Sequence, residues 1–180
     1  MTRRPRTTVR TAGGVSAIAV AISMLVASSA GARLPGASDW NYDVPTGTAI
    51  SQSDQRNGAL VSAYVRFSGD GRGFIYAFDV TIYRGTCKKG GQVQTDTPIG
   101  GTRAGGPDGP GHLRIPIRSD GRFSGRANVI NDKGVATIKG QIIDGGARMT
   151  GTVTAHVHNS AWGDCTGSGK IVHAKGTRIG

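Results

Sequence analysis

Apolar and polar residues alternate over several short segments, a period of two that is typical of β-strands with one buried face. These segments are 60–67, 74–82, 113–117, 123–129, 136–142, 147–158 and a last one near 170–175. In 147–158 the odd positions are apolar or small, and the even positions are Arg, Thr or His. In 74–82 the pattern predicts one inward face made of Phe74, Tyr76, Phe78, Val80 and Ile82.

Turn signals separate these segments and predict an antiparallel meander. Asp120-Gly121 is a hairpin dipeptide, and Gly69-Asp70-Gly71 ends the first strand. We therefore expect an all-β domain at 59–180, either a β-sandwich or an up-and-down β-barrel. Residues 92–97 and 100–111 are rich in loop-forming residues, and the second stretch is expected to be disordered.

The composition agrees with this fold class. The 180 residues include 30 Gly, only four Leu and no Glu, which excludes a helical bundle. All 11 acidic residues are Asp, which favours turns. No phosphate-binding or dinucleotide-binding loop is indicated, because no segment has the required strand-to-helix context. We expect no cofactor.

The N-terminus has the pattern of a secretory signal peptide at 1–32. Four Arg precede an apolar run at 15–27, and Ala30-Gly31-Ala32 fits a cleavage site after Ala32. The alternative is a membrane anchor, but the run is shorter than the roughly 20 residues that a spanning helix needs. Residues 33–58 show no period and are expected to be a flexible lead-in, with Trp40 and Tyr42 docking on the body.

Cleavage would leave 148 of the 180 residues. Since four of the 22 basic residues lie in the leader, the mature chain would carry +7 rather than +11. This charge favours anionic partners, although it could serve solubility alone. The two cysteines, Cys87 and Cys165, both lie in the exported part. Outside the cytosol they are expected to form one disulfide, because they lack the paired spacing of a zinc site.

Several motifs extend from about Tyr64 to Ala174. They are Phe67-Ser68-Gly69, Cys87-Lys88-Lys89-Gly90, Ile115-Pro116-Ile117, Asp120-Gly121-Arg122-Phe123-Ser124, Gly140-Gln141-Ile142, Gly151-Thr152 and Cys165-Thr166-Gly167. Together they resemble a widespread type of small secreted bacterial β-protein with a two-cysteine framework, whose members are functionally uncharacterised. The resemblance implies export, the β fold and the disulfide, and it implies no catalytic residues.

Three histidines are candidate metal ligands. His156 and His158 are two positions apart on one strand and point to the same face, and His173 could join them from a neighbouring strand. The alternative is that these histidines are exposed on a solvated face.

Hydrolytic chemistry has weaker support. Gly163-Asp164-Cys165-Thr166-Gly167 has a faint similarity to the nucleophile loop of trypsin-like proteases, but the nucleophile position is the cysteine assigned to the disulfide. A glycosidase needs two flanking carboxylates, and most Asp residues lie in turns. Asp79 is the exception, and we expect it to be exposed. A hydrolase would require Asp79 or Asp164 beside a His in a deep pocket.

The sequence thus favours a secreted, non-enzymatic β-domain, expected to be a monomer, that binds a partner at or outside the cell surface. An anionic cell-surface polymer or a glycan is the expected class of partner, since Tyr64 and Tyr83 lie with Arg66 and Arg84 on the predicted solvent-exposed face of the sheet. The alternatives are a secreted hydrolase using Asp and His, or a weak metal-binding module through His156 and His158.

Overall fold

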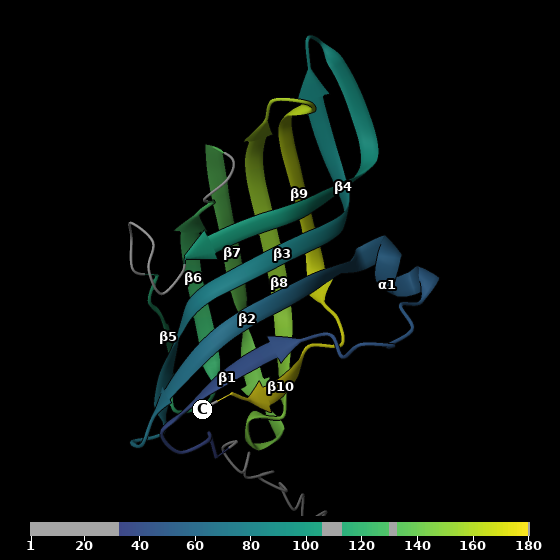
Figure 1. Ribbon diagram of the computed structural model, residues 1–180. Helices are drawn as coiled ribbons and strands as arrows, with labels where there is room; N and C mark the ends of the chain where they lie inside the picture. The colour runs from purple at the N-terminus through teal and green to yellow at the C-terminus, as the bar shows by residue number, and fades with distance from the viewer. Residues whose placement is uncertain (1–32, 106–112, 130–132, 180) are drawn as a thin grey trace, which may run out of the picture.

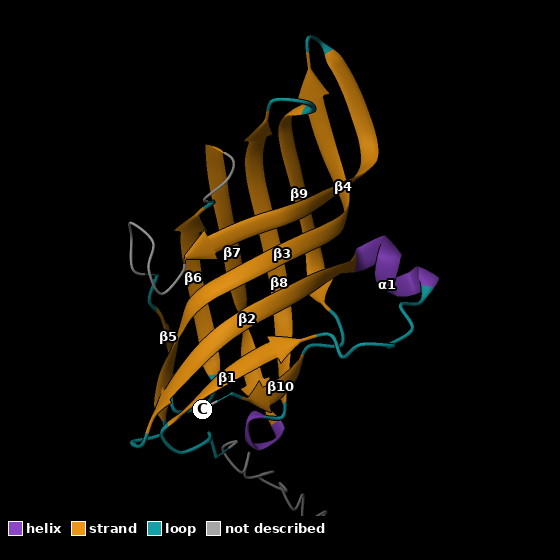
Figure 2. Ribbon diagram, viewed as in Figure 1, coloured by secondary structure: helices purple, strands orange, loops and turns teal. Residues whose placement is uncertain are grey.

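The computed structural model describes residues 33–105, 113–129 and 133–179, and this part of the chain is all-β, as the alternation predicts (Figure 1). Its helical structure is limited to α1 (Gln52–Asn57) and a 3-10 turn (Asp144–Gly146), as Figure 2 shows. The described strands are β1 (Ser38–Asp43), β2 (Gly58–Ser68), β3 (Arg72–Lys89), β4 (Gln92–Gly105), β5 (Ile115–Ile117), β6 (Arg122–Asn128), β7 (Lys133–Ile143), β8 (Arg148–Asn159), β9 (Gly163–Ile171) and β10 (Lys175–Arg178). None of the described helices has the length and apolar character needed to cross a bilayer.

The strands form a single sheet whose pairings return to their starting strand. β1 pairs with β2, β2 with β3, and β3 with both β4 and β5. From β5 the ladder continues through β6, β7 and β8, and β10 pairs with both β8 and β1. β9 lies beside β8 and also pairs with β3. In Figure 1, β1, β2 and β3 cross in front of β6 to β9, so the inner faces of the two layers enclose one core.

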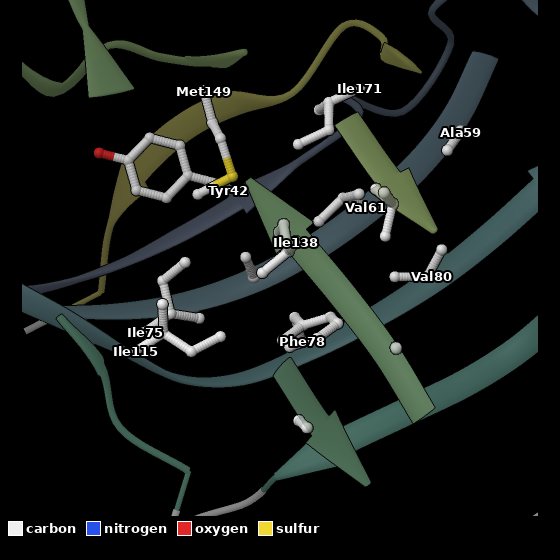
Figure 3. Close-up of a cluster of buried hydrophobic side chains, with 14 of the residues drawn as sticks. Tyr42, Ala59, Val61, Ile75, Phe78, Val80, Ile115, Ile138, Met149 and Ile171 are labelled. Atoms are coloured by element: carbon white, nitrogen blue, oxygen red, sulfur yellow. The ribbon is translucent and has the colours of Figure 1, made fainter. Parts of the chain in front are cut away.

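The core is built from the inward positions of the alternating strands (Figure 3). Its largest fully buried side chains include Val61, Val65, Phe67, Ile75, Phe78, Ile138, Ile142, Met149 and Val153. Tyr42, expected to dock on the body, is fully buried, and its hydroxyl donates to the Gly146 carbonyl oxygen at 2.8 Å. Burial raises the pKa of Tyr42 above its ordinary value. The phenol is therefore a neutral donor inside the protein.

The prediction that Phe74 and Tyr76 face inward is wrong, because β3 contains a β-bulge. Tyr64 pairs with Ala77 and Val65 with Ile75, so Tyr76 has no partner of its own in β2. One extra residue shifts the side-chain phase by one position. Before the bulge Ile75 points inward, while Phe74 and Tyr76 lie half-buried on the outer face; after it, the predicted inward residues Phe78, Val80 and Ile82 are buried.

Two regions are more regular than the sequence pattern predicts. Residues 92–105, expected to be largely loop, form β4 against β3. Three register shifts interrupt this pairing, and the sequence of the segment shows no period of two that would reveal the strand. The segment 33–58 contains β1 and α1. The expected disorder of 100–111 is wrong for 100–105, which belong to β4, and residues 106–111 lie outside the described residues.

Candidate functional site

The predicted disulfide is present and joins β3 to β9. Cys87 and Cys165 lie directly opposite each other in the antiparallel register, and both are buried. The bond connects residues 78 positions apart, for which the chain-entropy model gives a stabilisation of about 4 kcal/mol. Since both sulfurs lie in the core, this bond is structural and does not belong to a reactive site.

The three candidate metal ligands do not come together. His156 and His158 are exposed on the outer face of β8, and the His158 Nδ1 lies 2.6 Å from the Asp164 carboxylate. His173 lies beyond the other end of β9 and contacts Asp54 instead. No cluster of three metal-ligating side chains is found among the residues that the structure describes.

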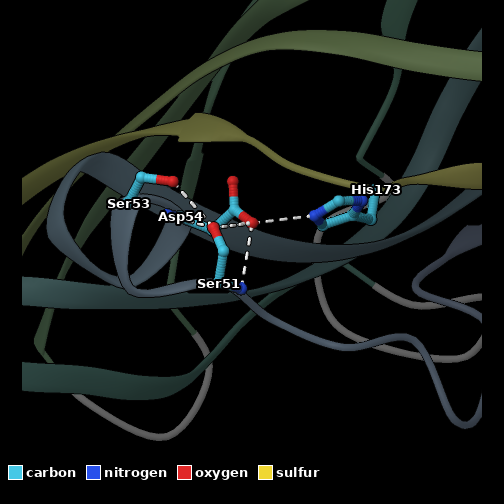
Figure 4. A network of polar contacts seen from close by, with 4 residues as sticks. All are labelled: Ser51, Ser53, Asp54 and His173. Atoms are coloured by element: carbon cyan, nitrogen blue, oxygen red, sulfur yellow. Dashed lines mark hydrogen bonds and ion pairs between the residues drawn. The ribbon is translucent and has the colours of Figure 1, made fainter.

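A polar cluster holds α1 against the connection between β9 and β10 (Figure 4). The Ser51 hydroxyl and the Asp54 carboxylate form a capping box, and the His173 Nε2 lies 3.0 Å from the same carboxylate. The hydrogen bond from His173, followed by that from Ser51, lowers the pKa of Asp54 to about 2. In a hydrolytic triad the imidazole contacts the hydroxyl, whereas here the carboxylate lies between them. The cluster therefore positions α1 and does not activate Ser51.

The aspartates proposed for hydrolysis are also poorly placed. Asp79 lies half-buried on the outer face of β3, where it pairs with Ser62 of β2. The Asp164 side chain is 79% exposed beside His158. Neither residue lines any of the hollows described below.

A row of polar side chains crosses the outer face of the rear layer at right angles to the strands. Ser124 of β6 lies opposite Lys139 of β7, Lys139 opposite Thr152 of β8, and Thr152 opposite Lys170 of β9. Because neighbouring strands are about 4.8 Å apart, the two lysines lie roughly 10 Å apart with a hydroxyl between them. Residues scattered along the chain are thus aligned by the register.

Two hollows meet on this row at Thr152. The first, of about 660 Å³, extends from Lys139 towards Arg118 and Arg122. Backbone rather than side chain forms part of its wall, because Gly140 and Gly151 face each other across β7 and β8. A Cβ on either glycine would overlap a carbonyl oxygen of the other strand.

The second hollow, of about 410 Å³, lies between the row and α1. Lys170, Arg56 of α1 and Arg84 of β3 line it, together with the hydroxyls of Thr154 and Ser168. A third hollow of about 500 Å³ shares Arg56 and Arg84 and continues past Tyr83. The shared residues make the three hollows one path, which we call the basic groove.

The charge of the basic groove is strongly one-sided. Six cationic side chains line it: Arg56, Arg84, Arg118, Arg122, Lys139 and Lys170. Its one carboxylate among the described lining residues is Asp96, which pairs with Arg84 at 3.0 Å. Arg122 lies 3.9 Å from Asp120, a weak exposed pair. The remaining four cations have no ion pair within the described ranges.

The sequence shows the excess positive charge but not this groove, because the cations that line the groove come from α1, β3, β6, β7, β9 and the segment after β5. The even positions of 147–158, with Thr152 and Thr154, were the one local signal. Comparisons with family models, curated proteins and solved structures found no match.

Proposed function

We propose that the protein is a secreted, non-enzymatic binding module whose basic groove holds a flexible anionic polymer at or outside the cell surface. The observation that carries the proposal is the alignment of six cations along one continuous path with a single carboxylate. A chain of phosphates, sulfates or carboxylates would place successive negative charges beside these cations, with Thr and Ser hydroxyls donating hydrogen bonds between them.

The shape of the groove favours a polymer over a small ion. Its three hollows are shallow parts of an extended path, whereas a site for a single anion would gather its donors around one point. The cations are also exposed, so each contact is weak alone and affinity requires many contacts at once. The leader pattern and the buried disulfide support export, because such bonds form outside the reducing cytosol.

The test is titration of the full chain with long-chain inorganic polyphosphate, followed by calorimetry at several salt concentrations. Orthophosphate at the same phosphate concentration is the comparison, since it carries the charge without the chain. If all six cations engage, counterion release of about 0.7 per contact gives a slope of about −4 in log affinity against log salt. The groove variant Arg56→Gln, Lys139→Gln, Lys170→Gln should reduce this slope to about −2 and weaken binding at low salt more than tenfold.

A matched control removes three positive charges elsewhere on the surface, through Arg72→Gln, Lys133→Gln and Lys175→Gln. None of these residues lines the basic groove. The control variant should keep the slope of the wild-type chain. Equal losses in the two variants would show that net charge alone attracts the polymer, and binding of polyphosphate no tighter than orthophosphate would also refute the proposal.

A further inference from the structure

The β-bulge in β3 creates an aromatic surface on the front layer, away from the row that crosses the rear layer. By shifting the side-chain phase it places Phe74 and Tyr76 on the outer face beside Tyr64. The ring centroids of Tyr64 and Tyr76 are 6.0 Å apart, and those of Phe74 and Tyr76 are 6.4 Å apart. Bulges of this kind often re-aim side chains at functional sites. These three half-buried rings are not part of the buried core.

Charged groups frame the rings: the Arg66–Asp39 ion pair lies beside the tyrosines, and Arg114 lies over Phe74. Arg66 donates two hydrogen bonds to Asp39, at 2.7 and 2.9 Å, and its guanidinium lies 5.6 Å from the centre of the Tyr76 ring. The Arg114 guanidinium lies 4.4 Å from the centre of the Phe74 ring and covers that end of the aromatic surface. The rings of Tyr64 and Tyr76 are thus the main stacking surface, with a donor and an acceptor group beside them.

The charge state of this frame is fixed at neutral pH. The hydrogen bond from Arg66 lowers the pKa of Asp39, so the carboxylate stays ionised. Burial, with a smaller effect of Asp39, raises the pKa of Tyr76, so its hydroxyl stays protonated. The surface therefore offers a carboxylate that accepts, and a guanidinium and a phenol that donate.

We propose that Tyr64, Tyr76 and the Arg66–Asp39 pair form a second binding site, which takes a neutral polysaccharide chain. Sugar rings present apolar C–H faces that pack on aromatic rings, and their hydroxyls both donate and accept hydrogen bonds. A polyanion fits the tyrosine end of this surface poorly, because Asp39 would repel it and Arg66 is already paired. The further cation, Arg114, lies at the Phe74 end, outside the proposed site. The two tyrosine rings are inclined by 40°, which suits successive rings of a twisted single chain better than a flat crystalline surface.

The test is native gel electrophoresis of the full chain with hydroxyethyl cellulose, a soluble neutral glucan, cast into the gel. The wild-type chain should be retarded. The variant Tyr64→Leu, Tyr76→Leu should be retarded roughly tenfold less, because leucine covers the sheet but offers no ring to stack on. Trp162→Leu is the control: it removes a 49% exposed aromatic side chain from the turn between β8 and β9, and should leave retardation unchanged.

Two further measurements keep the result interpretable. Thermal unfolding of the tyrosine variant should match that of the wild-type chain. If it does not, the single variant Arg66→Met is used in place of the tyrosine variant, and the same loss of gel retardation is expected. The groove variant with Arg56, Lys139 and Lys170 replaced by Gln should retain glucan retardation. No retardation of the wild-type chain, or equal retardation of the tyrosine and control variants, overturns the glucan site and leaves the polyphosphate result untouched. Loss of retardation in the groove variant also overturns it, because one site would then serve both ligands.

Discussion

The hydroxyl of Tyr42 tests whether the segment 33–58 is an integral part of the fold. This side chain is fully buried, and its one polar atom donates to the Gly146 carbonyl oxygen at 2.8 Å across the core. Tyr42→Phe keeps the ring and its packing but leaves that carbonyl without its donor. Loss of a buried hydrogen bond with one partner left in place costs about 1 to 3 kcal/mol. For a chain of this size the melting temperature should fall by roughly 3 to 10 °C.

The measurement is urea unfolding of the wild-type chain and of Tyr42→Phe, with the midpoint and the slope fitted separately. The midpoint should fall at an unchanged slope, which indicates a change in stability rather than in the surface exposed on unfolding. Tyr83→Phe is the control, because Tyr83 lies half-buried on the outer face, and its change should stay within about 0.5 kcal/mol. If Tyr42→Phe is as neutral as the control, then β1 is not an integral part of the core and 33–58 behaves as a lead-in.

Three further outcomes are expected. Replacing Cys87 and Cys165 together by Ala should lower the free energy of unfolding by about 4 kcal/mol, measured by urea unfolding, and a loss near zero would contradict the loop-closure argument. Asp54, whose pKa is lowered from 3.8 to about 2, adds stability that is fully present above about pH 4 and is lost as the pH falls through 2. Asp54→Asn should therefore flatten the fall in stability at acid pH, measured as the free energy of unfolding against pH. An unchanged fall would exclude the contact between Asp54 and His173 as the cause of this acid sensitivity. Gly151→Ala should destabilise the chain and lower the yield of folded protein, because Gly151 has a φ of 153° and the added Cβ would overlap a β7 carbonyl oxygen. If the variant unfolds at the same temperature as the wild-type chain, the two strands do not approach this closely.

The fold class and the disulfide were predictable because both depend on signals that are local or few in number. Alternation in 147–158 reports which face of a strand is buried, whatever its neighbours are, and β8 follows that pattern with Met149, Val153 and Ala155 in the core. Two cysteines allow only one pairing within a chain. The solvated outer face of β8, with Thr and His at its even positions, was predictable for the same reason.

The tertiary structure alone decided the register, and with it both candidate sites. The bulge at Tyr76 depends on how β3 pairs with β2, and β4 is a strand because β3 supplies its hydrogen bonds, not because its own residues alternate. In the same way, Lys139 and Lys170 become neighbours across β8 although 31 positions separate them in the sequence. Periodicity along a strand fixes which way each side chain points, but the side chains that share a surface are fixed by hydrogen bonds between segments that are distant in sequence.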